Sequence, residues 1–342
     1  MPQQRSDERA EGTVLSRRAF LTGAAAATAG LVAACQGLVK PAPTPTVALP
    51  GRAEILKFYP QAKSRVIVAR HGGVWSEEEL VAGALQQMLD AAITGLTGIH
   101  DALTAWMVLF DPEEIIGLKT NAISTTDATH PPLVLALAER LKTAGIPPEH
   151  IIIFDRRSNE LQAVGYPMNK DGPGVQCYGT DGAYSGAEHP VAKARVKLSE
   201  VLLKCDGIIN VPALRIHSMA GITFAMKNHF GCIDKPGSLH YPQHCDPGIP
   251  ELNALPEIKE RSRLTVGDAL ESYPFVENTL IVGVDPVACD YIGLKELIKL
   301  GEERDADMSF ITGKATHIAT AAQMGLGTND PTNIDLQEIE LG

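Results

Sequence analysis

Short apolar runs and longer stretches with helical spacing alternate along this chain. Runs of four or five apolar residues, bounded by polar or turn-forming residues, predict the core strands Arg65–Ala69, Ile115–Leu118, Ile151–Phe154 and Gly207–Val211. Apolar residues spaced three and four apart predict the helices Ser76–Ile93, His100–Phe110, Pro131–Gly145 and Leu198–Lys204. This succession favours an α/β fold, with a mainly parallel, doubly wound sheet covered by helices on both faces, in one body or two lobes.

The second half of the chain is less regular. Its apolar pattern predicts strands at Leu264–Val266 and Thr279–Val284, helices at Pro286–Leu300 and Thr316–Met324, and an edge strand at Ile334–Leu341. Glycine is frequent in Asp171–Gly186, which is predicted to be an excursion outside the core. Asp234–Pro250 is predicted to be a long loop, and loops of this length are often functional.

The stretch from Asp206 to Ile233 organises the candidate chemistry. Its strand, Gly207–Val211, is stopped by Pro212, because proline cannot continue a central strand. A helical spacing up to Gly231 is then carried by Met219, Ile222, Met226 and Phe230. In open α/β sheets ligands bind beyond the carboxyl ends of the strands, so the loop between this strand and helix is expected to face a ligand.

Polar and cationic side chains occupy this loop and the helix after it. The catalytic candidates are His217, Lys227 and Asn228. The candidate substrate-binding residues are Arg215 and Thr223 here, with Lys119 and Asn121 after the Ile115–Leu118 strand. Because parallel strands end at one edge of the sheet, Lys119 and Lys227 are expected to converge as a clamp for a carboxylate or phosphate. The alternative is that both are ordinary solvated lysines.

These segments resemble a known family. INVPALRIHSMAGITFAMKNHFG is similar to the central motif of the domain-of-unknown-function 362 family, in which N-x-P, K-x-H and T-x-x-x-K-N-x-x-G follow one another; Arg215 stands at the usual lysine position. Leu118–Asn121 resembles the family's K-x-N element, and Val284–Asp290 resembles its D-P-V-A-x-D element. The resemblance implies an architecture distantly similar to the nickel-pincer lactate racemase fold. It does not imply a reaction.

Other site chemistries are open or excluded. A divalent metal site is a hypothesis that rests on the spacing of His240 and His244, with no further ligand fixed by the sequence. Four acids that follow strands suit either proton transfer or helix capping, namely Asp155, Asp268, Asp285 and Asp290. The chain has no dinucleotide fingerprint, no P-loop and no G-x-S-x-G serine nucleophile motif.

The first residues have the features of an export signal. Ser16–Leu21 contains a twin-arginine pair and precedes an alanine-rich stretch, so residues 1–34 are predicted to be a twin-arginine signal peptide. Val32–Cys35 resembles a lipobox, which predicts lipidation of Cys35. Residues 35–60, rich in proline, are predicted to form a tether, and residues 61–342 the α/β domain. The protein is thus expected to be exported by the twin-arginine machinery and anchored to the outer face of the membrane.

Charge and cysteine content narrow the list of partners. Without residues 1–34 the chain keeps 26 basic and 38 acidic residues, a formal charge of −12, which makes nucleic acid an unsuitable partner. Beyond Cys35 there are five cysteines, of which Cys232 and Cys245 are a conceivable disulfide. No C-x-x-C is present, so an iron–sulfur cluster motif is absent from the sequence.

The sequence therefore predicts an exported, membrane-tethered α/β protein that acts as an enzyme on a small anionic metabolite. A ligand-binding lipoprotein without turnover is the main alternative, because it needs the same cationic clamp. A redox-associated protein is a third reading, and the missing cluster cysteines disfavour it. Substrate, reaction and cofactor are not fixed by the sequence.

Overall fold

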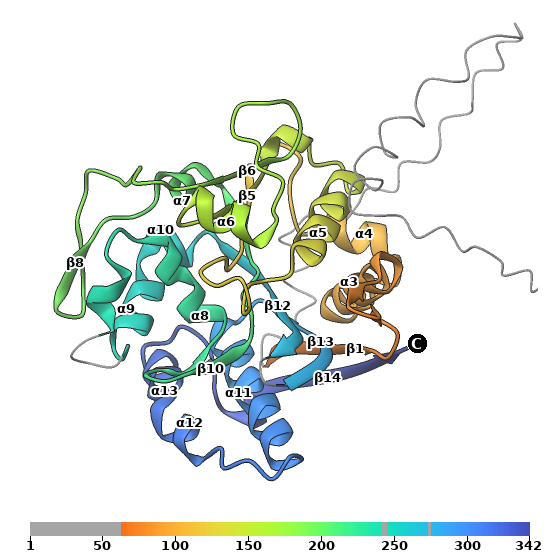
Figure 1. The fold of residues 1–342 in the computed structure, drawn as a ribbon, viewed down its shortest axis with the longest axis vertical. Coiled ribbons are helices and arrows are strands. Elements are labelled where there is room, and N and C mark those ends of the chain that lie inside the picture. The colour runs from red at the N-terminus through yellow and green to blue at the C-terminus, as the bar shows by residue number, and fades with distance from the viewer. Residues whose placement is uncertain (1–62, 241–244, 273–274) are drawn as a thin grey trace, which may run out of the picture. The chain divides into compact units, whose positions relative to one another are not determined.

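A computed structural model describes residues 63–240, 245–272 and 275–342 (Figure 1). The predicted signal peptide, the lipidation site Cys35 and the whole predicted tether lie outside these residues, as does His244. All the described residues belong to one compact unit. None of their helices is both long enough and apolar enough to cross a bilayer.

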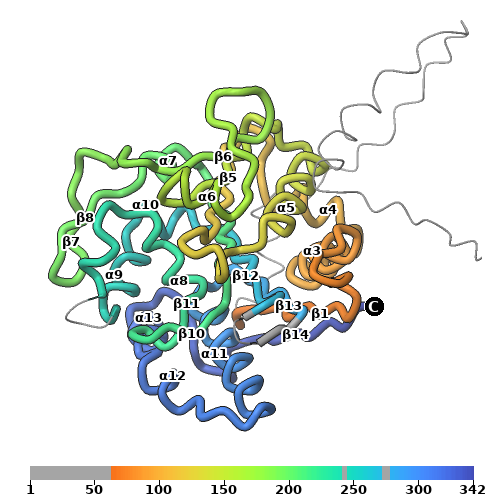
Figure 2. Tube along the Cα trace, viewed as in Figure 1, coloured from red at the N-terminus to blue at the C-terminus, as the bar shows by residue number. Residues whose placement is uncertain are grey.

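The centre of the fold is an eight-stranded sheet. In spatial order its strands are β14 (Ile334–Leu341), β1 (Ser64–His71), β13 (Phe275–Gly283), β12 (Ser262–Ser272), β9 (Gly207–Asn210), β4 (Ile116–Lys119), β5 (Ile151–Asp155) and β6 (Gln176–Gly179). Five of the seven neighbouring pairs are parallel, and the two antiparallel pairs both involve β13. The last strand, β14, lies beside the first, β1 (Figure 2). The predicted α/β class with a mainly parallel sheet is confirmed.

Helices cover both faces of this sheet (Figure 1). One face packs against α3 (Ala82–Thr97), α4 (Ala102–Met107) and α5 (Pro131–Thr143). The other face packs against shorter segments and one long helix, namely α7 (Glu200–Lys204), α8 (Ala225–Asn228), α9 (Gly248–Ala254), α10 (Pro256–Lys259), α11 (Pro286–Glu302), α12 (Ser309–Lys314) and α13 (Thr316–Gln323). Near the β5–β6 edge lies α6 (Ser158–Val164).

Alternation along the strands produces the two cores. In β1, Val66 and Val68 belong to one buried cluster, whereas Ile67 and Ala69 belong to the other. Successive strand side chains point to opposite faces, so a strand that is covered on both sides reads as a continuous apolar run. This explains why β1, β4, β5 and β9 were recognisable from sequence.

The helix predicted from Ser76 to Ile93 starts later than expected. Trp75–Ser76 (β2) and Glu79–Leu80 (β3) form a hairpin, and the helix α3 begins at Ala82. Glu77 lies in the turn with a left-handed φ of 57°. Trp75 pairs with Leu80 across the hairpin, and both pack on the core cluster that α3 contributes to. This apolar pair favours the hairpin over an additional helical turn.

The helix predicted from Met219 to Phe230 is wrong. Arg215–His217 (β10) pairs with Gly221–Thr223 (β11) in a hairpin, and α8 has only four residues, followed by the 3₁₀ turn His229–Cys232. Gly221 has a φ of 77°, and a Cβ there would lie 2.5 Å from the carbonyl oxygen of Ile311. The turn therefore requires glycine. The four apolar residues that mimic helical spacing lie in the hairpin turn, in β11, in α8 and in the 3₁₀ turn.

Two segments outside the predicted core contain regular structure. Gln176–Gly179, within the expected excursion, is the edge strand β6 and pairs in parallel with β5. The Asp234–Pro250 segment contains the 3₁₀ turn Pro236–Leu239 and the start of α9. Cys232 and Cys245 are both buried free thiols, so the suggested disulfide is not formed.

Candidate functional site

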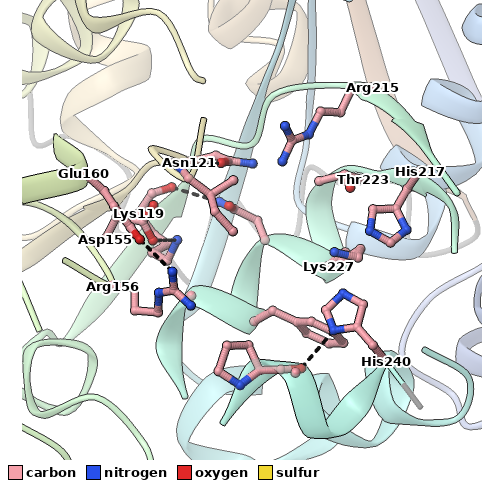
Figure 3. Close-up of a pocket in the computed structure, with 16 residues that line it drawn as sticks. Lys119, Asn121, Asp155, Arg156, Glu160, Arg215, His217, Thr223, Lys227 and His240 are labelled. Carbon is pink, nitrogen blue, oxygen red and sulfur yellow. Dashed lines mark hydrogen bonds and ion pairs between the residues drawn. The ribbon is translucent and has the colours of Figure 1, made fainter. Parts of the chain in front are cut away.

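A pocket of about 310 Å³ opens beyond the carboxyl ends of β4, β5 and β9 (Figure 3). All seven residues predicted to bind or transform substrate line it: Lys119, Asn121, Arg215, His217, Thr223, Lys227 and Asn228. His240 lines it as well, from the end of the Pro236–Leu239 turn. The structure thus brings together side chains from separate parts of the sequence, as parallel strand ends are expected to do.

Lys119 is held in a buried ion pair. Its Nζ lies 2.7 Å from Oδ1 of Asp155, and the two side chains are 1% and 6% exposed. Nζ also donates to the carbonyl oxygen of Thr120, and the backbone N–H of Ala122 donates to the second oxygen of Asp155. The positive charge of Lys119 is therefore matched within the protein. This differs from the expected free clamp, because Lys119 ties the ends of β4 and β5 together.

Gly231 allows this pair to fit beneath the 3₁₀ turn that follows α8. A Cβ at Gly231 would lie 2.4 Å from Oδ1 of Asp155 and 2.7 Å from Nζ of Lys119. Contacts this short require the ion pair to move. The glycine at the end of the central motif therefore has a packing role beside the pocket.

Asn228 links α8 to two strand ends. Its Nδ2 donates to the carbonyl oxygen of Lys119 and to Oδ1 of Asn210, at 3.1 and 2.7 Å. Asn210 in turn donates to the carbonyl oxygen of Ala225. These bonds fix α8 on the sheet, so the amide of Asn228 acts in positioning its neighbour Lys227.

The start of α8 is held from the opposite side by Asp290 of α11. Its Oδ2 accepts from the backbone N–H of Met226, while its Oδ1 has no partner among the described residues. Complete burial raises the pKa of Asp290. Asp285 accepts from the N–H groups of Val287 and Ala288, and this confirms the helix-capping reading of that acid.

Lys227 differs from Lys119 in having no counter-charge within the described part of the chain. Its side chain is buried, and no described residue makes a hydrogen bond or ion pair with its Nζ. The Nζ of Lys227 lies over the face of the Phe230 ring, 5.0 Å from its centroid. The pKa of Lys227 is lowered to about 8, mainly by burial; Cys245 opposes this shift and the charge of Arg215 adds to it.

His217 is fixed as a neutral hydrogen-bond donor. Its Nδ1 accepts from the backbone N–H groups of Met219 and Ala220, at 3.2 and 3.0 Å, so the ring proton resides on Nε2. Burial, followed by the charge of Lys227, lowers the pKa of His217 to about 3. In this tautomer His217 donates through Nε2 and has no free lone pair for a metal.

His240 has the opposite tautomer. Its Nδ1 donates to the carbonyl oxygen of Pro236 at 3.0 Å, which leaves Nε2 with a lone pair. The ring centroids of His240 and His217 are 5.6 Å apart, and Figure 3 shows both rings beside Lys227. Burial lowers the pKa of His240, and Lys227 adds to this effect. His240 thus contributes a proton acceptor next to a proton donor.

Two further residues of the pocket lining have unused hydrogen-bonding capacity. The Nε of Arg215 and the Oγ1 of Thr223 are buried and lack partners among the described residues. Nη1 of Arg215 contacts Asp127 at 3.2 Å, and burial lowers the pKa of the guanidinium. Buried polar groups are normally satisfied, so these two indicate a site for a polar ligand.

Comparison with known proteins identifies the family. The model for Domain of unknown function (DUF362) matches residues 116–295, which is more than half of the chain. The chain belongs to this family. The matched range of this DUF362 protein contains every candidate site residue within the described part of the chain. No curated protein matches it.

Two solved structures are similar to this DUF362 protein. A structural-genomics protein from Thermotoga maritima is 13% identical, with 66% of this chain and 61% of that chain covered and a TM-score of 0.41. The lactate racemase apoprotein from Thermoanaerobacterium thermosaccharolyticum is 9% identical, with 68% and 57% covered and a TM-score of 0.39. This chain therefore spans less than two thirds of either structure.

Sequence reasoning did not assign several residues of the DUF362 pocket. Arg156 contacts Glu160 one helical turn later, and Ile123 and Phe230 supply apolar lining. Arg156 directly follows Asp155, so its position after a strand was a usable signal. Nothing in the local pattern distinguished the paired Lys119 from the unpaired Lys227.

A metal site is not assembled by the described residues of this DUF362 protein. They contain no group of three His, Cys, Asp or Glu side chains arranged to hold an ion. His240 offers Nε2, but a second nitrogen from His217 requires a change of tautomer and the loss of two backbone hydrogen bonds. The proposed partner of His240, His244, lies outside the described residues.

Proposed function

We propose that this DUF362 protein is an enzyme that acts on a small anionic metabolite bound in the pocket around Lys227. The observation that carries the proposal is the buried Lys227 side chain, which lines the pocket and whose ammonium group has no protein counter-charge among the described residues. A buried charge without a partner is costly, and an anionic ligand supplies the missing partner.

The distribution of charge in the pocket supports an anion. Its described lining contains four cationic side chains, Lys119, Arg156, Arg215 and Lys227, and two carboxylates, Asp155 and Glu160. Both carboxylates are used, the first by Lys119 and the second by Arg156. Arg215 pairs with Asp127, so the surplus positive charge of the described lining is that of Lys227, within a chain whose formal net charge is −11. Such a surplus concentrates anions locally.

Proton chemistry distinguishes an enzyme from a simple binding protein. A binding site for a carboxylate needs donors such as Arg215 and Thr223, but it does not need a lone pair at His240 or a lysine with a pKa of about 8. A proton donor, a proton acceptor and an ionisable amine in one pocket are the components of acid–base catalysis. This combination favours turnover over capture.

Calorimetric titration with lactate, pyruvate, oxalate and phosphate tests binding. At least one of these anions is expected to bind the unmodified protein, and Lys227→Met is expected to weaken that binding by roughly 10- to 150-fold, since a hydrogen bond to a charged group contributes about 1.5–3 kcal/mol. Lys299→Met, which removes an exposed lysine of α11, is the matched control and should bind normally. Proton exchange at carbon in D₂O, followed by NMR, then separates turnover from binding.

We also propose, from the sequence alone, that the protein is exported by the twin-arginine route and tethered through lipidated Cys35. Replacing Arg17 and Arg18 by lysine is expected to retain the protein in the cytoplasm. Cys35→Ala is expected to prevent incorporation of labelled fatty acid. A divalent metal at His240 and His244 stays a proposal that elemental analysis of the natively exported protein addresses.

A further inference from the structure

We infer that Lys227 forms a covalent imine with the carbonyl carbon of a small 2-oxo acid, whose carboxylate is held by Arg215 and Thr223. This inference rests on the proposed function and specifies its substrate class. It concerns the Lys227 amine as a nucleophile, whereas the proposed function requires only that the pocket binds and transforms an anion.

The environment of Lys227 is suited to a nucleophilic amine. A lysine attacks a carbonyl only when its amine is neutral, and a neighbouring carboxylate would hold the proton on it. Lys119 has such a neighbour in Asp155, at 2.7 Å, whereas Lys227 has none among the described residues. Burial lowers the pKa of Lys227 to about 8. At a pH half a unit below this pKa, roughly a quarter of the Lys227 amine is therefore neutral.

The two histidines supply the proton transfers that imine formation requires. The amine nitrogen attacks the carbonyl carbon, a C–N bond forms, and the C=O electron pair moves to oxygen. Nε2–H of His217 is a hydrogen-bond donor for this developing alkoxide, and the lone pair on Nε2 of His240 accepts the proton that the nitrogen loses. His240 returns this proton to the oxygen, which gives a carbinolamine. His240 then takes the remaining proton from the nitrogen and delivers it to the hydroxyl group, so the C–O bond breaks, water leaves and C=N forms. Amine and carbonyl become imine and water, with no oxidant or reductant.

The unused donors of the pocket explain why the carbonyl compound should carry a carboxylate. Nε of Arg215 and Oγ1 of Thr223 are buried and have no hydrogen-bond partner among the described residues. Arg215 and Thr223 lie directly opposite each other on the two strands of the β10–β11 hairpin. Figure 3 shows Arg215, Thr223 and Lys227 around the same space. A carboxylate satisfies both donors and leaves the adjacent carbonyl carbon for the amine.

Reductive trapping tests this inference on the full chain. The protein is incubated with pyruvate or glyoxylate and sodium cyanoborohydride, and peptide mass spectrometry locates the reduced adducts. Lys227 is expected to be modified faster than Lys119 and the exposed Lys299, and the rate should rise from pH 6 to 8 as the amine loses its proton. Acetone, which has a carbonyl but no carboxylate, should label Lys227 at least tenfold more slowly than pyruvate.

The variants separate the possible results. Lys227→Arg keeps a cation in place and cannot form an imine, so it should abolish this adduct while retaining the fold; Lys227→Met should do the same. Equal labelling of Lys227 and Lys299, or no pyruvate adduct on Lys227, overturns the inference. If lactate binding still depends on Lys227 in that case, the proposed function is retained and only the imine is rejected. Labelling by acetone as fast as by pyruvate overturns the assignment to 2-oxo acids.

Discussion

The Nζ of Lys119 lies 2.7 Å from Oδ1 of Asp155, and both side chains are almost completely buried. The sequence placed Lys119 and Lys227 in one anion clamp, and the structure places both at one pocket but in different states. Lys119 is neutralised by Asp155, whereas Lys227 has no counter-charge among the described residues. The two lysines are therefore expected to respond differently to the same substitution.

Lys119→Met should destabilise the fold. It leaves Asp155 as a buried carboxylate without its cation, and breaking a buried pair costs about 3–5 kcal/mol. Urea unfolding of Lys119→Met, Asp155→Leu and the double variant measures this. The double variant should be more stable than either single variant, because no unpaired charge remains. Additive losses would show that the pair is not coupled.

The contribution of Lys227 to the free energy of unfolding should change with pH in alkaline solution. Its pKa in the folded protein is about 8, below the ordinary value of 10.5, so the unfolded chain binds more protons between these values. The free energy of unfolding of the unmodified protein should thus rise relative to Lys227→Met as pH increases from 8 to 10.5, by roughly 3 kcal/mol. A constant difference between the two proteins across this window contradicts the lowered pKa.

His217 should stay neutral in mildly acidic solution. Its pKa of about 3 is below the ordinary 6.5, so the folded protein binds fewer protons than the unfolded chain between these values, and this contribution to stability is lost as pH falls. Nitrogen NMR should show His217 as the neutral Nε2–H tautomer at pH 5. A protonated ring at pH 5, or a proton on Nδ1, would remove the assigned donor role.

Gly231→Ala should disturb the pocket, and Gly237→Ala should not. The added methyl group at Gly231 would lie 2.4 Å from Asp155 Oδ1, whereas a Cβ at Gly237 has no heavy atom within 4 Å. Both glycines line the pocket, so they form a matched pair. We expect a loss of about 1–3 kcal/mol for Gly231→Ala in urea unfolding and little change for Gly237→Ala. Similar values for both variants contradict the packing role of Gly231.

Much of the sheet and the residue content of the site followed from the sequence. The buried runs in β4, β5 and β9 were recognisable because strands covered on both faces are continuously apolar. Parallel topology then placed their carboxyl ends, with Lys119 and the segment around His217, at one edge of the sheet.

The remaining features depend on contacts between distant residues. The β10–β11 hairpin depends on Gly221, whose left-handed turn packs against the backbone of Ile311. The apolar residues around it have helical spacing, so the sequence predicted a helix there instead. The Lys119–Asp155 pair joins residues on two strands. The tautomers of His217 and His240 depend on backbone groups that only the folded chain places beside the rings. Local patterns do not encode such relationships.

The most direct test of the account is proton uptake on anion binding. Because an anion stabilises the ammonium form, binding should raise the pKa of Lys227 and take up a proton near pH 8.5. Calorimetry of lactate or oxalate binding in buffers of different ionisation enthalpy measures this uptake. The account predicts uptake by the unmodified protein and by Lys299→Met, with none for Lys227→Met and at least tenfold weaker binding. Equal affinity and equal proton uptake in all three proteins would contradict a function centred on Lys227.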